Sequence, residues 1–261
     1  MLKFLIVALA MTLTSACTTT PPVPAAARTE LAPTGKLRAG MNLGNALFTQ
    51  KDPATGALRG VSVDLMRELG ARLGVPVEFV MYDTPGQVAD AADSNAWDVA
   101  ILAIEQARAR TISFSPPMTE IEATYVVHKD SPLRSAAQVD GAGVRIAASE
   151  KAGYELYLTR TVRNATLIRP KGLPAAIELF SARGADAVAA LKPQLLESTD
   201  LLKEARMVDG NFMIVNHGLG TPRERPAGAA YLQAFVNDLV ASGFIAKSIA
   251  ANGVQGLSAV K

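Results

Sequence analysis

Residues 61–81 decide the fold class, and they read VSVDLMRELGARLGVPVEFVM. Apolar side chains recur at every fourth position from 61 to 73, which predicts an amphipathic helix that ends at Gly74. The short apolar stretch 77–81 then predicts a strand. A helix that leads directly into a strand is part of a βαβ unit, so the layers are expected to be α/β.

The same alternation continues on both sides of this stretch. It indicates mostly parallel sheets, and it restarts near residue 130, which predicts two lobes. Strands are expected over 36–41, 77–81, 97–104, 124–128, 143–148, 166–168, 185–191 and 212–215, and helices over 61–73, 85–94, 153–161, 173–182, 227–242 and 243–251.

The N-terminus is typical of a targeting segment. Lys3 provides a positive charge, and the apolar run 4–11 that follows it is too short to span a bilayer. This pattern predicts a signal peptide over 1–16. The segment resembles the bacterial lipoprotein signal, in which the first mature residue, here Cys17, is lipidated. The alternative is ordinary cleavage after Ala16, which leaves a free cysteine. Residues 17–34 are expected to form a flexible tether that holds the domain at a membrane surface.

Composition excludes several classes of function. The 26 basic and 24 acidic residues nearly balance, and aromatic residues make up 5% of the chain, which argues against nucleic-acid binding. One cysteine and two histidines cannot build an intrachain disulfide or a zinc site of the Cys/His type. We therefore expect no metal, no cofactor and no nucleic-acid partner.

Short motifs along the chain resemble one known family. They are Gly60-Val61-Ser62-Val63-Asp64-Leu65, Arg72-Leu73-Gly74-Val75, Trp97-Asp98-Val99, Arg108-Ala109 with Phe114-Ser115-Pro116-Pro117, Gly184-Ala185-Asp186-Ala187 and Ser242-Gly243-Phe244-Ile245. In this combination and order they resemble the bacterial extracellular solute-binding proteins of family 3, the amino-acid-binding type. The resemblance covers roughly residues 35–252.

The resemblance implies a type II periplasmic-binding-protein fold with two hinged lobes. Lobe 1 would comprise 35–126 plus 216–252 and lobe 2 would comprise 127–215, with a C-terminal tail over 253–261. Two crossing strands, near 125–128 and 213–215, would form the hinge. A ligand would bind in the cleft and the lobes would close around it.

Arg108 is the first candidate for a ligand contact. The family's matching arginine grips a ligand carboxylate, which a guanidinium can do with two parallel hydrogen bonds. The alternative is a surface arginine that pairs with Glu105. The family usually has threonine where this chain has Glu105, and an acid there would repel a bound carboxylate unless it is protonated or engaged by the arginine.

A second departure concerns the ligand's ammonium group. The family often holds it with an aspartate at the position of Leu191, which Lys192 follows here. The set of residues that binds both charged groups of an amino acid is therefore incomplete. Two alternatives remain for the ligand: it has a different polarity, or its cationic group contacts Glu105, Glu120 or Glu122. The remaining candidates for ligand contacts are Asn42, Asn45, Phe48, Ser149, Gly153, Tyr154 and Glu122.

The sequence contains no Gly-x-Ser-x-Gly, His-Glu-x-x-His or Gly-x-x-x-x-Gly-Lys motif. His128 and His217 lie near the expected hinge and are interpreted as packing residues. The sequence predicts a non-enzymatic, monomeric, lipid-anchored periplasmic protein that captures a small carboxylated, amino-acid-like solute for an ABC permease. One alternative is a periplasmic dehydratase of the cyclohexadienyl type, with Glu105 as its acid. The other is a sensory or orphan binding module.

Overall fold

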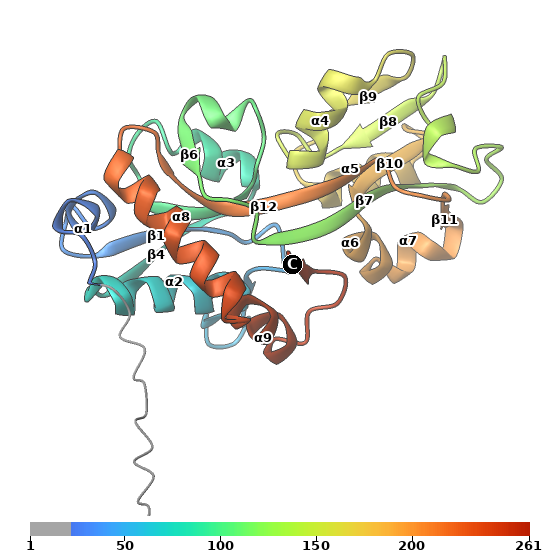
Figure 1. The fold of residues 1–261 in the computed structure, drawn as a ribbon. Coiled ribbons are helices and arrows are strands. Elements are labelled where there is room, and N and C mark those ends of the chain that lie inside the picture. Colours follow the sequence, from blue (N-terminus) through green and yellow to red (C-terminus); the bar gives the residue numbers. More distant parts are fainter. Residues whose placement is uncertain (1–21) are drawn as a thin grey trace, which may run out of the picture.

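The computed structural model describes residues 22–261. The expected signal peptide and Cys17 lie outside these residues. Two lobes stand side by side and are joined by two long strands, β7 (Thr119–His128) and β12 (Met213–Pro222), which run through the centre of the molecule (Figure 1).

Lobe 1 is built on three parallel strands. The order is β4-β1-β5, with β12 antiparallel to β5. Its elements are α1 (Ala25–Leu31), β1 (Leu37–Asn42), β2 (Gln50–Lys51), β3 (Leu58–Arg59), α2 (Val61–Leu73), β4 (Val77–Tyr82), α3 (Pro85–Asp90), β5 (Val99–Ala103), the 3-10 turn η1 (Arg108–Arg110), β6 (Ile112–Phe114), α8 (Pro226–Ala241) and α9 (Phe244–Ala251).

Lobe 2 repeats this plan. Its parallel strands are ordered β10-β8-β9, and β7 is antiparallel to β10. Its elements are the 3-10 turn η2 (Ala136–Gln138), β8 (Arg145–Ala148), α4 (Gly153–Thr161), β9 (Thr166–Ile168), α5 (Leu173–Ser181), β10 (Ala187–Leu191), α6 (Lys192–Glu197), α7 (Thr199–Glu204) and β11 (Ala205–Met207).

The predicted two-lobed α/β class is confirmed. The crossing strands hydrogen-bond to each other and to both lobes, so the two parallel halves form one continuous sheet. The lobe boundaries expected from the sequence, 126/127 and 215/216, fall inside β7 and β12. The final strand β13 (Ser258–Ala259) pairs with β7, so the expected tail joins the sheet there.

The same arginine–aspartate motif fixes the first strand of each lobe. In lobe 1, Asp98 accepts hydrogen bonds from the backbone N–H, Nε and Nη2 of Arg38 at 2.9, 3.0 and 2.7 Å. In lobe 2, Asp186 accepts the same three from Arg145 at 2.8, 3.0 and 2.9 Å. The aspartates that the sequence motifs singled out therefore hold strands together.

The expected tether is wrong for residues 25–31, which form the helix α1. Leu31 is fully buried and packs against Gly228 of α8, whose backbone N–H donates to the Glu30 carboxylate at 2.7 Å. The prolines before Ala25 suggested an extended chain, but Ala25–Ala27 and Leu31 are strong helix formers. The folded unit therefore begins about ten residues earlier than expected.

In residues 22–261 no single helix is long and apolar enough to cross a membrane. Helices α8 and α9 together have the length and apolar composition of a span, but they meet at an angle of 68°.

Candidate functional site

A cavity of about 180 Å³ lies between the lobes, beside the crossing strands. Its lining comes from the carboxyl ends of parallel strands in both lobes: Asn42 ends β1, Ala103 ends β5, Leu191 ends β10, and Ser149 follows β8. Ligand sites of open α/β sheets form at this edge, because loops and helix N-termini converge there. The volume is close to that of cavities that hold a benzene-sized molecule.

Arg108 lines this cavity from η1 and is 4% exposed. Its Nη1 donates to the carbonyl oxygen of Ala103 at 3.0 Å, and its Nη2 donates to that of Lys151 in lobe 2 at 2.9 Å. Its Nε is buried without a hydrogen-bond partner. Burial lowers the pKa of Arg108 to about 10, and nearby carboxylates, with Glu105 first, oppose that effect. The guanidinium is therefore charged at neutral pH.

The end of β1 and the loop after it, residues 42–48, supply three further candidates from lobe 1. The side-chain oxygen of Asn42 accepts from the backbone N–H of Gly44 at 3.0 Å, and that of Asn45 accepts from the backbone N–H of Leu47 at 3.3 Å. Phe48 is buried beside the ring of His217, with the centroids 4.7 Å apart. All three predicted residues of this region line the cavity.

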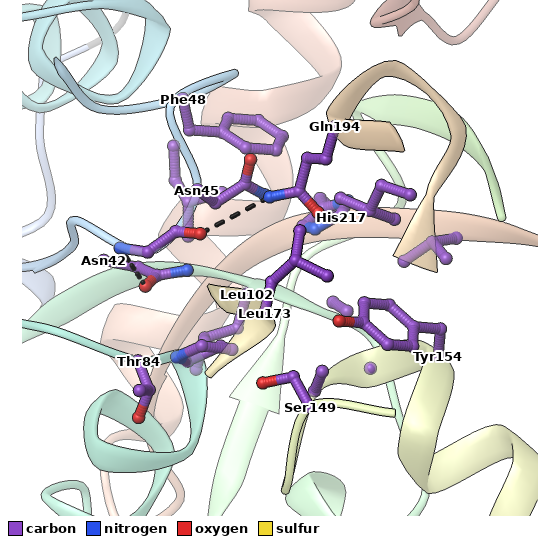
Figure 2. A pocket seen from close by; sticks show the side chains of 18 of the residues that line it. Asn42, Asn45, Phe48, Thr84, Leu102, Ser149, Tyr154, Leu173, Gln194 and His217 are labelled. Carbon is purple, nitrogen blue, oxygen red and sulfur yellow. Dashed lines mark hydrogen bonds between the residues drawn. The ribbon is translucent and has the colours of Figure 1, made fainter. Parts of the chain in front are cut away.

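Lobe 2 contributes Ser149, Gly153 and Tyr154 to the lining. The hydroxyl groups of Ser149 and Tyr154 point into the cavity (Figure 2). Burial raises the pKa of the Tyr154 phenol well above its ordinary value, so the phenol keeps its proton. Gly153 and Tyr154 open α4, where the first backbone N–H groups of a helix have no partner within the helix.

Two predicted residues, Glu105 and Glu122, are not part of the lining. Glu105 is buried, and its carboxylate is held by Nη1 of Arg160 in α4, across the gap between the lobes. Glu122 lies on β7 and forms an ion pair with Lys192 at 2.5 Å. Each carboxylate already has a cation, so neither is free for a ligand.

Sequence reasoning missed His217 as a lining residue. It lies on β12, is buried and has no partner for its Nδ1. Burial and the charge of Arg108 lower the pKa of His217 to about 3, so the imidazole is neutral near neutral pH. Thr84, Leu173 and Gln194 also line the cavity (Figure 2), as does Leu191. The rule that sites form after the carboxyl ends of strands would have pointed to Thr84 and Leu191.

Four polar contacts join the lobes around the cavity in the part of the chain that the structure describes. In one of them the side-chain NH₂ of Gln194 in lobe 2 donates to the carbonyl oxygen of Gly44 in lobe 1 at 3.4 Å (Figure 2). Arg108 bonds to the Lys151 carbonyl, Arg160 holds Glu105, and the ammonium group of Lys151 lies 2.6 Å from the carboxylate of Asp90. The two lobes are therefore in direct contact, as in a closed state. No group of three or more histidine, cysteine or acidic residues in residues 22–261 could hold a metal ion.

Two hinged α/β lobes with a small cavity between them define the class of extracytoplasmic solute-binding proteins. Residues 37–251 match the sequence profile of the bacterial extracellular solute-binding proteins, family 3, and the chain belongs to this family. It is therefore a solute-binding protein. No curated protein matches the chain in sequence.

Solved structures share the fold. A mutant of ArgBP from T. maritima superposes with a TM-score of 0.71 at 20% identity, over 86% of this chain and 98% of that one. An amino acid ABC transporter substrate-binding protein, AbpA from Streptococcus pneumoniae bound to L-arginine, gives 0.71 at 18% identity, over 85% and 96%. The ancestral amino acid-binding protein AncCDT-1, a precursor of cyclohexadienyl dehydratase, gives 0.70 at 22%, over 86% and 98%.

Proposed function

We propose that the chain captures a small carboxylated solute in the cavity between its lobes and delivers it to an ABC permease. The observation that carries this proposal is the buried guanidinium of Arg108. Arg108 and Arg225 are the arginines buried in residues 22–261. Arg225 is paired with the carboxylate of Asp98 at 2.7 Å, whereas no carboxylate lies within 4.0 Å of the Arg108 guanidinium in the part of the chain that the structure describes.

A buried cation without a counter-ion is costly, since burial favours neutral or paired groups. Backbone carbonyls offset part of that cost for Arg108, but they carry no net charge. An anion that enters the cavity would supply the missing charge, and a carboxylate matches the planar guanidinium. The unpaired cation therefore favours an anionic ligand over a neutral or cationic one.

The start of α4 supports the same ligand class from the opposite lobe. The backbone N–H groups of Gly153 and Tyr154 lie at a helix N-terminus that lines the cavity. Such a terminus carries partial positive charge and favours anions. A carboxylate between Arg108 and α4 would touch both lobes, which is how a ligand stabilises a closed state.

The proposal also covers the membrane anchor, the cellular compartment and the transporter partner. We infer that Cys17 carries a lipid, that the chain before α1 tethers a monomer to a membrane in the periplasm, and that the closed form is recognised by the permease. Membership of an extracellular solute-binding family supports the compartment. Mass spectrometry of the mature N-terminus tests the lipid: an unmodified cysteine or cleavage elsewhere would contradict it.

A thermal-shift screen tests the ligand class. It should include amino acids, 2-oxo and 2-hydroxy acids, dicarboxylates, opines and polyamines. We expect every compound that raises the melting temperature to carry a carboxylate. Stabilisation by polyamines or by neutral solutes alone would overturn the proposal.

The dehydratase alternative is favoured by one finding, the structural similarity to a dehydratase precursor. It needs an acid in the cavity, and Glu105, the acid considered for it, holds Arg160 instead. Incubation with prephenate, monitored for new ultraviolet absorbance, separates the two functions. A binder leaves the absorbance unchanged, and product formation would establish the enzyme.

A further inference from the structure

Resting on the proposed function, we propose that the captured solute is a carboxylic acid without an ammonium group. Its body would be apolar, and its second polar group would be neutral, as in a 2-oxo or 2-hydroxy acid. This inference concerns the part of the ligand that faces away from Arg108. It follows from the charged, polar and apolar groups that line that part of the cavity.

The lining offers no buried acid to an ammonium group. Among the lining residues, only Asp83 has a carboxylate, and Asp83 is exposed. A solvated carboxylate attracts a cation weakly, because water screens it. Glu155, at the start of α4, is buried but already accepts from Arg169 and Thr159 through Oε1 and from the backbone N–H of Lys151 through Oε2. An enclosed ammonium would therefore lose its hydration without gaining a counter-ion.

The two asparagines of lobe 1 face the cavity as donors. The side-chain oxygen of Asn42 is taken by the backbone N–H of Gly44, and that of Asn45 by the backbone N–H of Leu47. Because a backbone N–H can only donate, the bonded atoms must be the amide oxygens, which leaves the NH₂ groups for a ligand. Together with Arg108 and the start of α4, they make a lining rich in donors, which suits oxygen acceptors.

His217 adds a neutral polar group to this lining. Its Nδ1 is buried and has no partner, and the ring stays neutral because burial depresses its pKa to about 3. A neutral imidazole nitrogen accepts or donates one hydrogen bond, according to the tautomer. It suits a hydroxyl or carbonyl group of a ligand and does not neutralise an ammonium.

Much of the remaining lining is apolar. The side chains of Leu102 and Leu173 and the ring of Phe48 are part of it (Figure 2). Leu191 lines the cavity as well. Leu191 is buried at the end of β10. These walls favour a short apolar body, since burial of hydrocarbon in the cavity is favourable.

Matched analogues test the inference by calorimetry. Each amino acid is compared with the 2-oxo, 2-hydroxy and unsubstituted carboxylic acids that carry the same side chain, for every side chain whose compounds stabilise the protein in the thermal-shift screen. L-leucine and 4-methyl-2-oxopentanoate are one such pair. We expect the amino acid to bind at least about tenfold more weakly than its oxo or hydroxy partner. An amino acid that binds as tightly as its partners would overturn the inference and leave carboxylate capture intact. If no acid binds at all, the proposed function itself fails.

A pair of variants provides the matched control. In Leu191→Asp the cavity gains a carboxylate, and in Leu191→Asn it gains a neutral group of the same size. Far-ultraviolet circular dichroism confirms that each variant folds. We expect only Leu191→Asp to shift the preference toward the amino acid, by about tenfold. An equal change in both variants, or none in either, would count against the inference.

Discussion

The guanidinium of Arg108 in lobe 1 donates a hydrogen bond from Nη2 to the carbonyl oxygen of Lys151 in lobe 2, 2.9 Å away. The same guanidinium lines the cavity and has no carboxylate partner within residues 22–261. One side chain thus lies both in the ligand site and at the contact between the lobes. We therefore expect occupation of the cavity to favour closure of the lobes.

Gly153 permits the close approach of the lobes. A Cβ atom at this position would lie 2.5 Å from the Cβ of Ala103 in lobe 1. Gly153→Ala should therefore block full closure and weaken ligand binding at least about tenfold. The melting temperature without ligand should change little, because alanine is the better helix former. Calorimetry and small-angle X-ray scattering with ligand measure both effects.

Gly141→Ala is the control for that variant. Gly141 lies in lobe 2 away from the cavity, and a Cβ there would approach no atom closer than 3.3 Å. It should bind and close like the wild type. Tight binding by Gly153→Ala would show that the closed lobes can sit further apart than in this structure.

The ion pair between Arg160 and Glu105 should stabilise the closed form. Glu105 is buried, whereas the Arg160 side chain is 39% exposed, so water screens part of the interaction. Arg160→Ala should lower ligand affinity by about three- to tenfold and make it less sensitive to ionic strength.

Arg183→Ala is the matched control, since Arg183 pairs with Asp130 within lobe 2 on exposed side chains. It should leave ligand affinity unchanged over a salt titration. Equal losses of ligand affinity in Arg160→Ala and Arg183→Ala would show that removing any positive charge weakens binding, and would contradict a specific role of the Arg160–Glu105 pair.

The two aspartates of the repeated motif should differ in their effect on stability. Asp98 is fully buried and also accepts from Arg225, whereas the Asp186 side chain is 39% exposed. Asp98→Asn should cost about 3–5 kcal/mol of unfolding free energy, because it breaks a buried charge network. Asp186→Asn should cost about 1 kcal/mol or less. Urea unfolding of both variants measures the difference, and similar losses would contradict it.

His217 should make stability depend on pH. Its pKa of about 3 in the folded protein lies below the ordinary value of 6.5, so below pH 6.5 the unfolded chain binds a proton that the folded chain does not. Stability is therefore fully present above pH 6.5 and falls toward pH 3, by up to about 1.4 kcal/mol per pH unit.

His217→Asn should flatten this dependence, most clearly between pH 6.5 and 5, where few carboxylates titrate. Denaturant unfolding at a series of pH values measures it. A slope as steep as that of the wild type would show that the imidazole is protonated in the folded state.

Much of the fold was predictable because local signals agree with the tertiary structure. Helix α2 spans 61–73 as predicted, since its apolar face is regular and Gly74 takes the left-handed conformation that ends it. The crossing strand β12 is longer than predicted. Its glycines at 218 and 220 are unfavourable in an isolated strand, but neighbours on both sides supply the pairing.

The site was predictable only in part, for a physical reason. Arg108 could be recognised because it follows a strand within a short motif. The role of Glu105 could not, since its partner Arg160 is 55 residues away and belongs to the other lobe. His217 was interpreted as a packing residue because it lies near the expected hinge. Contacts that form only when the lobes meet leave no local pattern in the sequence.

Calorimetric titration of Arg108→Ala with the strongest carboxylate from the thermal-shift screen tests the central claim most directly. We predict that affinity falls by at least about thirtyfold, because the variant removes the buried cation that meets the anion. Thermal unfolding without ligand shows whether the variant is folded. Affinity equal to that of the wild type would contradict the claim that this guanidinium holds the solute.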